Sequence, residues 1–402
     1  MSKTMSKTGL IETISLKGLT LAPSQIWGPV RLVPVLRHAQ RHDLRLTKRP
    51  YEACLTQVAL AGRDVEKPDL AYYSYIPHGL VMEWSEDGSP VAAAGSQLAD
   101  PKRPRGPWRS MATLHRMAKR ETKNRLRLLP LHMAMDSYLA LHFSGPDVVW
   151  KDYSRKARSS HGLSPRSEIT FSGRAVPLLE DALRLFEIHD EQVGVLLFVA
   201  DALASAFIVP HHEDYRALHT SLIEDFYAEI LLIWAQYGTA AELTFTVAPE
   251  KVESLADIAA AVAKLRADWA DFQGFMATDL IQRPLTAKRL YTAGPFALQS
   301  FMTDLALKSE NHIGEVIIRD TGEMEYLKTY RLSEAQTQRA WLLQQLAAHQ
   351  WNIEQTAAAL RTSADQLILR LEKLGFGDLI HQGRKDLARK NVRVQQKAKR
   401  TS

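Results

Sequence analysis

The chain has 402 residues, of which 46% are hydrophobic and 24% charged, and its formal net charge at pH 7 is +6. A chain of this length and apolar content can bury a substantial core, so general disorder is excluded and two or three globular domains are expected. The single cysteine, Cys54, excludes an intramolecular disulfide, and no Cys/His spacing matches a structural zinc site.

Neither the N-terminus nor the most apolar segment has the pattern of an export signal or a membrane span. Residues 1–9 lack an apolar core after their lysines and are expected to be disordered. Residues 193–210 are apolar except for Asp201 and Ser205, but a central aspartate opposes membrane insertion by about 2.5–3.5 kcal/mol. We predict two buried strands here, or a strand and a helix, in a cytoplasmic protein that makes no membrane contact.

The first ninety residues are predicted to be mainly β-strand. Residues 11–37 alternate apolar and polar side chains in short runs that Gly and Pro interrupt, and LTQVAL, AYYSYI and LVMEW continue the pattern. Residues 86–110 are rich in Gly, Ser, Pro and Ala and are predicted to form a long loop.

A basic cluster follows, because residues 102–127 hold ten Lys and Arg side chains against one acid, Glu121. From Met111 the stretch has helical character. Such a surface could hold phosphates without reading sequence, bind an anionic small ligand such as a nucleotide, or be a solvated helix face paired with acids elsewhere. The candidate anion-binding residues are Arg103, Arg105, Arg109, Arg116, Lys119 and Arg120.

A group of histidines and carboxylates surrounds residues 193–210. Clustered His, Asp and Glu can hold a divalent metal, and His211, His212 and Glu213 are the candidates. Against this interpretation, adjacent histidines are expected to point in different directions on a helix or a strand, and no HEXXH spacing is present. No GxGxxG, Walker A, GxSxG or CxxC pattern occurs either, so we assign no metal, no cofactor and no catalytic residue.

Three segments of the first half resemble the ARPP family of uncharacterised bacterial domains. They are GPVRLVPVLR, SYLALHFSGPDVVW and the stretch from Leu185 to Leu231. The resemblance covers about residues 10–240 and implies an α+β domain. The family's gene neighbours include ADP-ribosylglycohydrolases and rhodanese-like phosphatases, so a link to stress or nucleotide metabolism is implied by association alone.

Residues 241–332 are predicted to be a mixed region of helix and hairpin. A helix is expected from about Val252 to Phe272. Residues 311–332 are expected to form a hairpin that turns at Asp320-Thr321-Gly322. Ser333 is a suitable N-cap for the next helix.

Residues 333–380 are predicted to form three short helices. Apolar residues recur at i, i+4 or at i, i+4, i+7 in each segment, which is typical of an amphipathic helix. The stripes are Leu342 and Leu346; Ile353, Ala357 and Leu360; and Leu367, Leu371 and Leu374. Asn352 and Ser363 can cap the second and third helices, and Gly375 can end the last. Helices this short are stable only when they pack on one another.

The run from Asn352 to Phe376 resembles the Fis-type helix-turn-helix of Fis and of nitrogen-regulator enhancer-binding proteins. In that pattern an Asn opens the middle helix, a Ser or Thr caps the recognition helix, and a Leu-rich face ends in Leu-Gly-aliphatic. The matching residues are Asn352, Ala357, Leu360, Ser363, Leu367, Leu371, Leu374 and Gly375. The resemblance implies DNA binding by a homodimer.

Two departures from that pattern bear on DNA reading. Arg361 stands in the turn, where Gly is usual, and Asp365 and Glu372 cancel the charges of Arg370 and Lys373. A neutral recognition helix that begins with the carboxylate of Asp365 is expected to repel phosphate. Gln366, the next residue, could still read adenine. The alternative is a packing or dimerisation module that keeps the shape without reading bases.

The end of the chain is strongly basic, with eight Lys and Arg against one acid in residues 384–400. We expect this tail to be disordered alone and to seek phosphates, or to serve only as a solubilising terminus. The candidate DNA-binding residues are Gln366, Arg370, Lys373, Arg361, Arg384, Lys385, Arg389 and Lys390.

These features predict an α+β protein with a small all-α module and a basic tail from residue 381. The expected function is a DNA-binding transcriptional regulator, a homodimer whose N-terminal region is a sensor or scaffold and could bind a small anionic ligand. The alternative is an enzyme or ligand-binding protein of ADP-ribose or nucleotide stress metabolism whose terminal module binds a partner.

Overall fold

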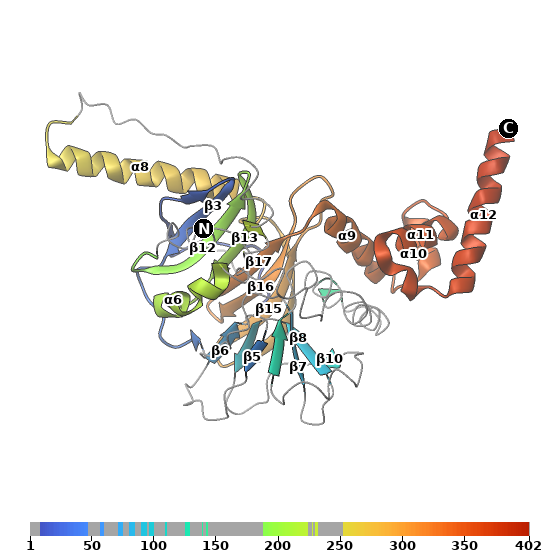
Figure 1. The fold of residues 1–402 in the computed structure, drawn as a ribbon, viewed down its shortest axis with the longest axis horizontal. Helices are drawn as coiled ribbons and strands as arrows, with labels where there is room; N and C mark the ends of the chain where they lie inside the picture. Colours follow the sequence, from blue (N-terminus) through green and yellow to red (C-terminus); the bar gives the residue numbers. More distant parts are fainter. Residues whose placement is uncertain are drawn as a thin grey trace.

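The fold is α+β, with a large sheet in the body and a helical module at the C-terminal end (Figure 1). The structure is a computed structural model that describes residues 9–46, 188–223 and 252–401. Between the first two ranges it describes short strands within residues 57–128 and three residues within 139–143, and after residue 223 it describes residues 227, 230 and 231. Within these parts, no helix is both long and apolar enough to cross a membrane.

A nine-stranded sheet forms the centre of the body, and all of its pairings are antiparallel. Its order is β1-β3-β12-β13-β17-β16-β15-β14, with β2 also paired to β3. The strands are β1 (Thr20–Leu21), β2 (Gln25–Trp27), β3 (Val30–Leu36), β12 (Gln192–Val199), β13 (Ala202–Ile208), β14 (Leu285–Ala293), β15 (Phe296–Thr303), β16 (His312–Arg319) and β17 (Met324–Arg331). The sheet therefore combines strands from the regions 10–240 and 241–332.

The apolar segment at residues 193–210 is a hairpin of two buried strands, β12 and β13, as one of the two predicted alternatives required. Ala200 and Asp201 form its turn, with φ values of 47° and 63°. Asp201 interrupts the apolar run because it lies at this turn, where its side chain is half exposed. Its carboxylate accepts a hydrogen bond from the buried guanidinium of Arg31 at 3.2 Å.

Two smaller sheets use the strands between residues 45 and 128. One has the order β10-β8-β7-β11-β5 and the other β4-β6-β9. The strands are β4 (Arg45–Leu46), β5 (Gln57–Ala59), β6 (Ala71–Ser74), β7 (Leu80–Trp84), β8 (Pro90–Ala94), β9 (Ser96–Ala99), β10 (Arg109–Ser110) and β11 (Arg125–Leu128).

The long loop predicted for residues 86–110 was wrong, because this stretch contains β8, β9 and β10. Its runs of Ala, Ser and Gly carry no polar-apolar alternation, so their strand conformation comes from pairing with neighbours such as β7 rather than from local preference. The helical character predicted from Met111 also fails at residues 125–128, which form β11. Residues 111–124 lie outside the described part.

The predicted helix and hairpin of the middle region are both confirmed. α8 (Leu255–Met276) begins within three residues of the expected start, and β16 and β17 turn at Asp320-Thr321-Gly322. The other helices are α6 (His212–Ser221), α9 (Glu334–Ala348), α10 (Ile353–Ala359), α11 (Ala364–Leu371), a wide turn η4 (Glu372–Phe376), a short 3₁₀ turn η5 (Gly377–Leu379) and α12 (Gln382–Thr401).

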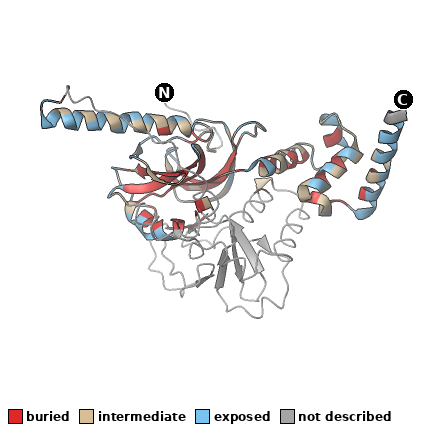
Figure 2. Cartoon of the chain, turned by 45° about the horizontal axis from the view of Figure 1, so that its top comes forward, coloured by how far each residue is buried: buried red, intermediate tan, exposed pale blue. Residues whose placement is uncertain are grey.

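The central strands of the large sheet, β3, β12, β13, β15, β16 and β17, are buried on both faces, and they appear red in Figure 2. One face packs with residues of α6 and belongs to a core that continues through α9 into the helical module. The opposite face is covered by residues 11–21 and by the segment that follows α8, where Ile14 bridges to Ile281. The helical module is thus attached to the body through a continuous apolar core.

A buried ion pair lies on adjacent strands of this sheet. Glu315 of β16 and Lys328 of β17 are directly paired in register, and both side chains are fully buried, with 3.1 Å between Nζ and Oε2. Burial lowers the pKa of Lys328, and the Glu315 carboxylate opposes that shift. The Glu315 carboxylate therefore compensates in part for the burial of the Lys328 ammonium.

Removing one partner of this pair should destabilise the fold more than removing both. Lys328→Met leaves an unpaired carboxylate in the core and is expected to lower the free energy of unfolding by about 3–5 kcal/mol. The double variant Glu315→Leu/Lys328→Met should recover most of that loss. Urea denaturation of both single variants and the double variant measures the coupling, and additive losses would contradict a buried, interdependent pair.

A second buried group makes stability depend on pH. The His312 side chain is fully buried, and its pKa is lowered to about 3 by burial and by the positive charges of Arg331 and Arg283. Because the unfolded chain takes up this proton near pH 6.5 and the folded chain does not, the contribution of neutral His312 is complete above that pH and declines as the pH falls toward 3.

The wild type should therefore lose roughly 2 kcal/mol more unfolding free energy than His312→Leu between pH 7.5 and pH 5. Denaturant titrations of both proteins at the two pH values measure this difference. If the two proteins show the same pH dependence, His312 is not the group that titrates.

Candidate nucleic-acid interface

The helices α9, α10 and α11 begin at the predicted N-caps. Ser333 forms a capping box with Gln336 at the start of α9. Asn352 Oδ1 accepts a hydrogen bond from the amide of Gln355 at 2.9 Å, and Ser363 Oγ accepts one from the amide of Gln366 at 3.1 Å. These caps satisfy amides that the first helical turn leaves without partners, so the three helix starts are determined locally.

The predicted apolar stripes pack the three helices together. Leu342 and Leu346 of α9, Ala357 of α10, and Leu367 and Leu371 of α11 are all buried in one cluster. Gly375 ends the last helical segment with a φ of 87°, as expected for a residue without a side chain. The arrangement of three packed helices is therefore confirmed.

Arg361 adopts a left-handed conformation in the turn between α10 and α11. Its φ is 52°, and the amide of Thr362 donates to the carbonyl of Ala357 at 2.9 Å, which closes the end of α10. Glycine would adopt this conformation without the roughly 1–2 kcal/mol that a side chain costs there. The backbone therefore gains nothing from arginine, whose exposed side chain places a cation just before α11.

One face of α11 and η4 is exposed and carries no acid. Gln366, Arg370 and Lys373 follow at i, i+4 and i+7, and all three side chains are exposed. The Arg370 guanidinium lies over the Trp341 ring, 5.0 Å from its centroid, which holds the arginine in place while leaving it accessible. Thr362 Oγ1 donates to Gln366 Oε1 at 2.7 Å and orients that amide.

The basic tail is a helix, so the prediction of disorder was wrong. α12 spans Gln382–Thr401, and its composition of Arg, Lys, Gln and Ala favours helix, with no Gly or Pro after Gly383. The first half packs on α11, where Ala388 is fully buried. From Arg393 to Ala398 every side chain is exposed, and the helix projects beyond the module (Figure 1).

Polar contacts between α12 and the rest of the module involve the acids. Asn391 Nδ2 donates to Asp365 Oδ2 at 3.0 Å, Arg389 pairs with Glu372, and Arg384 pairs with Glu354 at 2.6 Å. Each acid lies on the side of the module that faces α12. The charges of residues 363–376 cancel in sum, as expected, but Asp365 and Glu372 are held toward α12 while Arg370 and Lys373 are exposed.

The structure divides the candidate DNA-binding residues into two groups. Arg361, Gln366, Arg370, Lys373 and Lys390 are exposed. Lys385 is only 8% exposed, Arg389 is paired with Glu372 and Asp386, and Arg384 is paired with Glu354. The two arginines connect α12 to α10 and to η4. Arg393 and Lys397, which the sequence analysis did not select, share the exposed side of α12 with Lys390 at i, i+3, i+7 spacing.

The metal candidates form a helix cap instead of a ligand set. His211 Nδ1 accepts a hydrogen bond from the amide of Glu213 at the start of α6. The rings of His211 and His212 stack with centroids 4.4 Å apart, contrary to the expected divergence, because His211 is extended and His212 is the first helical residue. Burial, and then the nearby Arg45, lower the pKa of His211 to about 4. Within the described ranges, no three His, Cys, Asp or Glu side chains are grouped to hold a metal.

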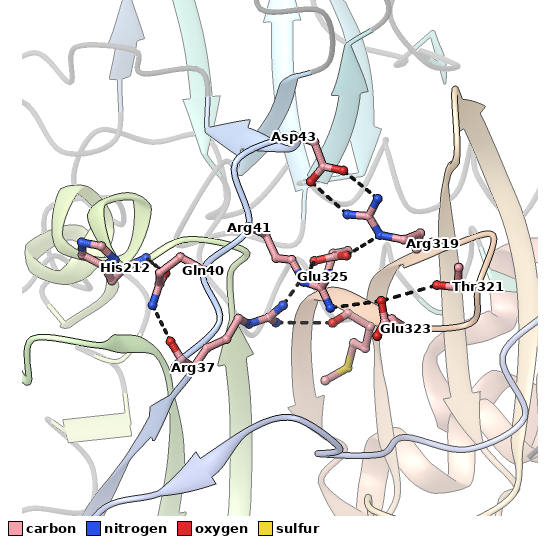
Figure 3. Close-up of polar contacts among 10 residues, drawn as sticks. Arg37, Gln40, Arg41, Asp43, His212, Arg319, Thr321, Glu323 and Glu325 are labelled. Atoms are coloured by element: carbon pink, nitrogen blue, oxygen red, sulfur yellow. Dashed lines mark hydrogen bonds and ion pairs between the residues drawn. The ribbon is translucent and has the colours of Figure 1, made fainter. Parts of the chain in front are cut away.

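A network of arginines and acids ties residues 37–46 to the β16–β17 hairpin (Figure 3). Glu325 is fully buried and accepts from Arg37 at 3.2 Å and from Arg319 at 2.8 Å, while Arg41 pairs with Glu323 at 3.0 Å.

The same network continues on either side of Glu325. Asp43 receives two hydrogen bonds from Arg319, which lower the pKa of the Asp43 carboxyl. Gln40 accepts from the His212 amide and so links the segment to α6. Since each of the three guanidiniums has a carboxylate partner, the network positions the segment and offers no unneutralised cation to an anion.

Most of the N-terminal anion-binding candidates lie outside the residues that the structure describes. Arg109 belongs to β10, where it is paired in register with Ala92 of β8. Arg103, Arg105, Arg116, Lys119 and Arg120 lie outside the described residues.

These features define an α+β domain that is followed by a small helical module with one acid-free exposed face. A family model described as ARPP-2 matches residues 14–294. The chain therefore belongs to the ARPP-2 family, and the match extends beyond the predicted limit of residue 240 to include α8 and β14. The helical module lies outside it. No curated protein and no solved structure matches the chain.

Docking of α12 on α11 can be tested at Ala388, whose side chain is fully buried. Ala388→Glu should displace α12, because the added carboxylate has no room or partner in the interface. Amide hydrogen exchange in residues 382–392 is expected to become at least about tenfold faster. Leu387→Glu is the matched control, since Leu387 is 57% exposed on the same helix. Equal exchange in both variants would show that α12 does not dock as described.

Proposed function

We propose that this protein binds DNA through α11 and α12 and acts as a transcriptional regulator in the cytoplasm. In this proposal the ARPP-2 domain is a sensor or scaffold. The observation that carries the proposal is the separation of charge in the module. Asp365 and Glu372 are engaged by α12, while Gln366, Arg370 and Lys373 share an exposed face.

The order and caps of the helices support this assignment. α10 and α11 have the positions of the two helices of a helix-turn-helix, and the resemblance to the Fis-type pattern assigns α11 as the helix that enters the major groove. Gln366 lies in the first turn of α11, where side chains meet base edges. A glutamine can pair bidentately with adenine, which is worth about 1–3 kcal/mol of discrimination.

The basic residues extend the surface in two directions from α11. Arg361 precedes the helix, and Arg370 and Lys373 follow Gln366 along the exposed face. On α12, Lys390, Arg393 and Lys397 add an exposed row of cations. In this proposal these cations contact phosphates, which supplies affinity and salt dependence but no sequence information.

The proposal predicts that the exposed cations of α11 and η4 set the affinity for duplex DNA. Arg370→Ala/Lys373→Ala should weaken binding at least tenfold and reduce the slope of log affinity against log salt by about 2, since each phosphate contact contributes roughly 0.9. Fluorescence anisotropy with a labelled duplex at several salt concentrations measures both quantities.

The matched control is Lys17→Ala/Lys308→Ala, which removes two exposed cations from the body of the molecule. This control should bind as the wild type does. If the α11 variant retains wild-type affinity and salt slope, or if the control loses as much as the variant, the module is not the DNA-binding surface. Gln366→Ala tests base reading separately, because it should reduce the preference among selected sequences while leaving the salt slope unchanged.

A further inference from the structure

The helix α8 projects from the body of the molecule (Figures 1 and 2). It has 22 residues and begins with a capping box in which Ser254 and Asp257 satisfy each other's backbone amides. Gln273, near its C-terminal end, is its one buried residue, and Ala277 and Leu280 follow in the core. The helix is therefore anchored in the body at its C-terminal end.

An apolar stripe with a coiled-coil period runs along α8. Its members follow one another at alternating intervals of three and four residues, which is the a and d pattern of a heptad repeat. They are Leu255, Ile258, Val262, Leu265, Trp269, Phe272 and Met276. The exposed fraction is 85% for Leu255, 46% for Ile258 and 39% for Val262, while the four members from Leu265 onward are partly buried. Scattered exposed apolar residues are ordinary, whereas a continuous stripe of this kind marks an interface.

Side-chain size changes along the helix. Five alanines accompany the stripe in residues 256–263, while Trp269, Phe272 and Phe275 crowd the other half. An antiparallel pair of such helices places the bulky half of each against the small half of the other. A parallel pair would instead set aromatic against aromatic at one end and alanine against alanine at the other, which leaves unequal spacing.

We propose that α8 pairs antiparallel with α8 of a second copy of this chain. The register that aligns the stripes sets Leu255 against the partner's Phe272, Ile258 against the partner's Trp269, and Val262 against the partner's Leu265. Within residues 255–272, every a residue then meets a d residue of the partner. The exposed Leu255 at one end of the stripe is covered by the aromatic residues at the other.

The charges beside the stripe fit this pairing. Arg266 and Asp268 are at the flanking e and g positions. In the antiparallel register they lie opposite the partner's Ala259 and the partner's Ala261, so the flanking positions bring no like charges together. The pairing is thus compatible in charge as well as in size.

The expected interface is small but specific. A helix of this length extends about 33 Å. Two such helices correspond to the lower end of the range for specific complexes, roughly 1,200 Å² in total. The fraction of dimer should therefore depend on the protein concentration. A dimer would bring two helical modules into one assembly.

The molar mass of the full-length protein in solution tests the pairing. Sedimentation equilibrium over about 1–100 μM should show a monomer–dimer equilibrium. Val262→Glu should raise the dissociation constant at least about tenfold, because it buries an unpaired carboxylate in the seam. Ala260→Glu is the control, since Ala260 is exposed on the face away from the stripe, and it should dimerise as the wild type does. A monomeric wild type, a Val262→Glu dimer of unchanged strength or an equally weakened control would overturn the proposal.

Cross-linking tests the direction of the helices. In a Cys54→Ser background, Leu255→Cys mixed with Phe272→Cys should form a disulfide-linked dimer on oxidation. Leu255→Cys alone should not, because its two copies would be about 25 Å apart. A linked dimer from Leu255→Cys alone would overturn the antiparallel arrangement. Neither experiment measures DNA binding, so failure of the regulator proposal would leave both results interpretable.

Discussion

The pairing of β13 with β17 is the contact on which the rest of the body depends. It is the junction in the large sheet between the strands of residues 20–208 and those of residues 285–331. Two registered pairs, Phe207 with Lys328 and Ile208 with Leu327, are extended by side-chain bonds: Ser205 Oγ donates to the Thr329 carbonyl at 2.7 Å, and the Ala206 amide donates to Thr329 Oγ1 at 2.8 Å. These bonds satisfy buried backbone groups where the regular ladder ends.

The same junction determines how the helical module is attached. β17 leads directly through Ser333 into α9, and the apolar core below the sheet continues among the module helices. The Arg37, Arg319 and Glu325 network then ties the end of β3 to the β16–β17 hairpin from the other side. An error in pairing β13 with β17 would therefore disturb both the polar network and the base of α9.

Charge in the module is organised by α12. Summed along the sequence, the cations and acids of residues 363–376 cancel. In three dimensions Asp365 and Glu372 lie toward Asn391 and Arg389, and Gln366, Arg370 and Lys373 lie on the exposed side. Coulomb interactions depend on distance and burial, so a surface potential cannot be obtained by counting residues. Asp365 and Glu372, which along the sequence are expected to repel phosphate, are the groups that hold the basic helix in place.

Local signals in the sequence determined the elements whose causes are themselves local. The caps Ser333, Asn352 and Ser363, the Asp320-Thr321-Gly322 turn and the apolar periodicity of α8 and α11 act within a few residues, and the structure has them where they were predicted. The heptad spacing of α8 was also present in the sequence, but its meaning depended on exposure. Only the tertiary structure decided which strands pair across long separations, that residues 86–110 contain strands, that α12 is an ordered helix, and which charges face one another. These outcomes depend on partners far away along the chain, and local preference carries no information about them.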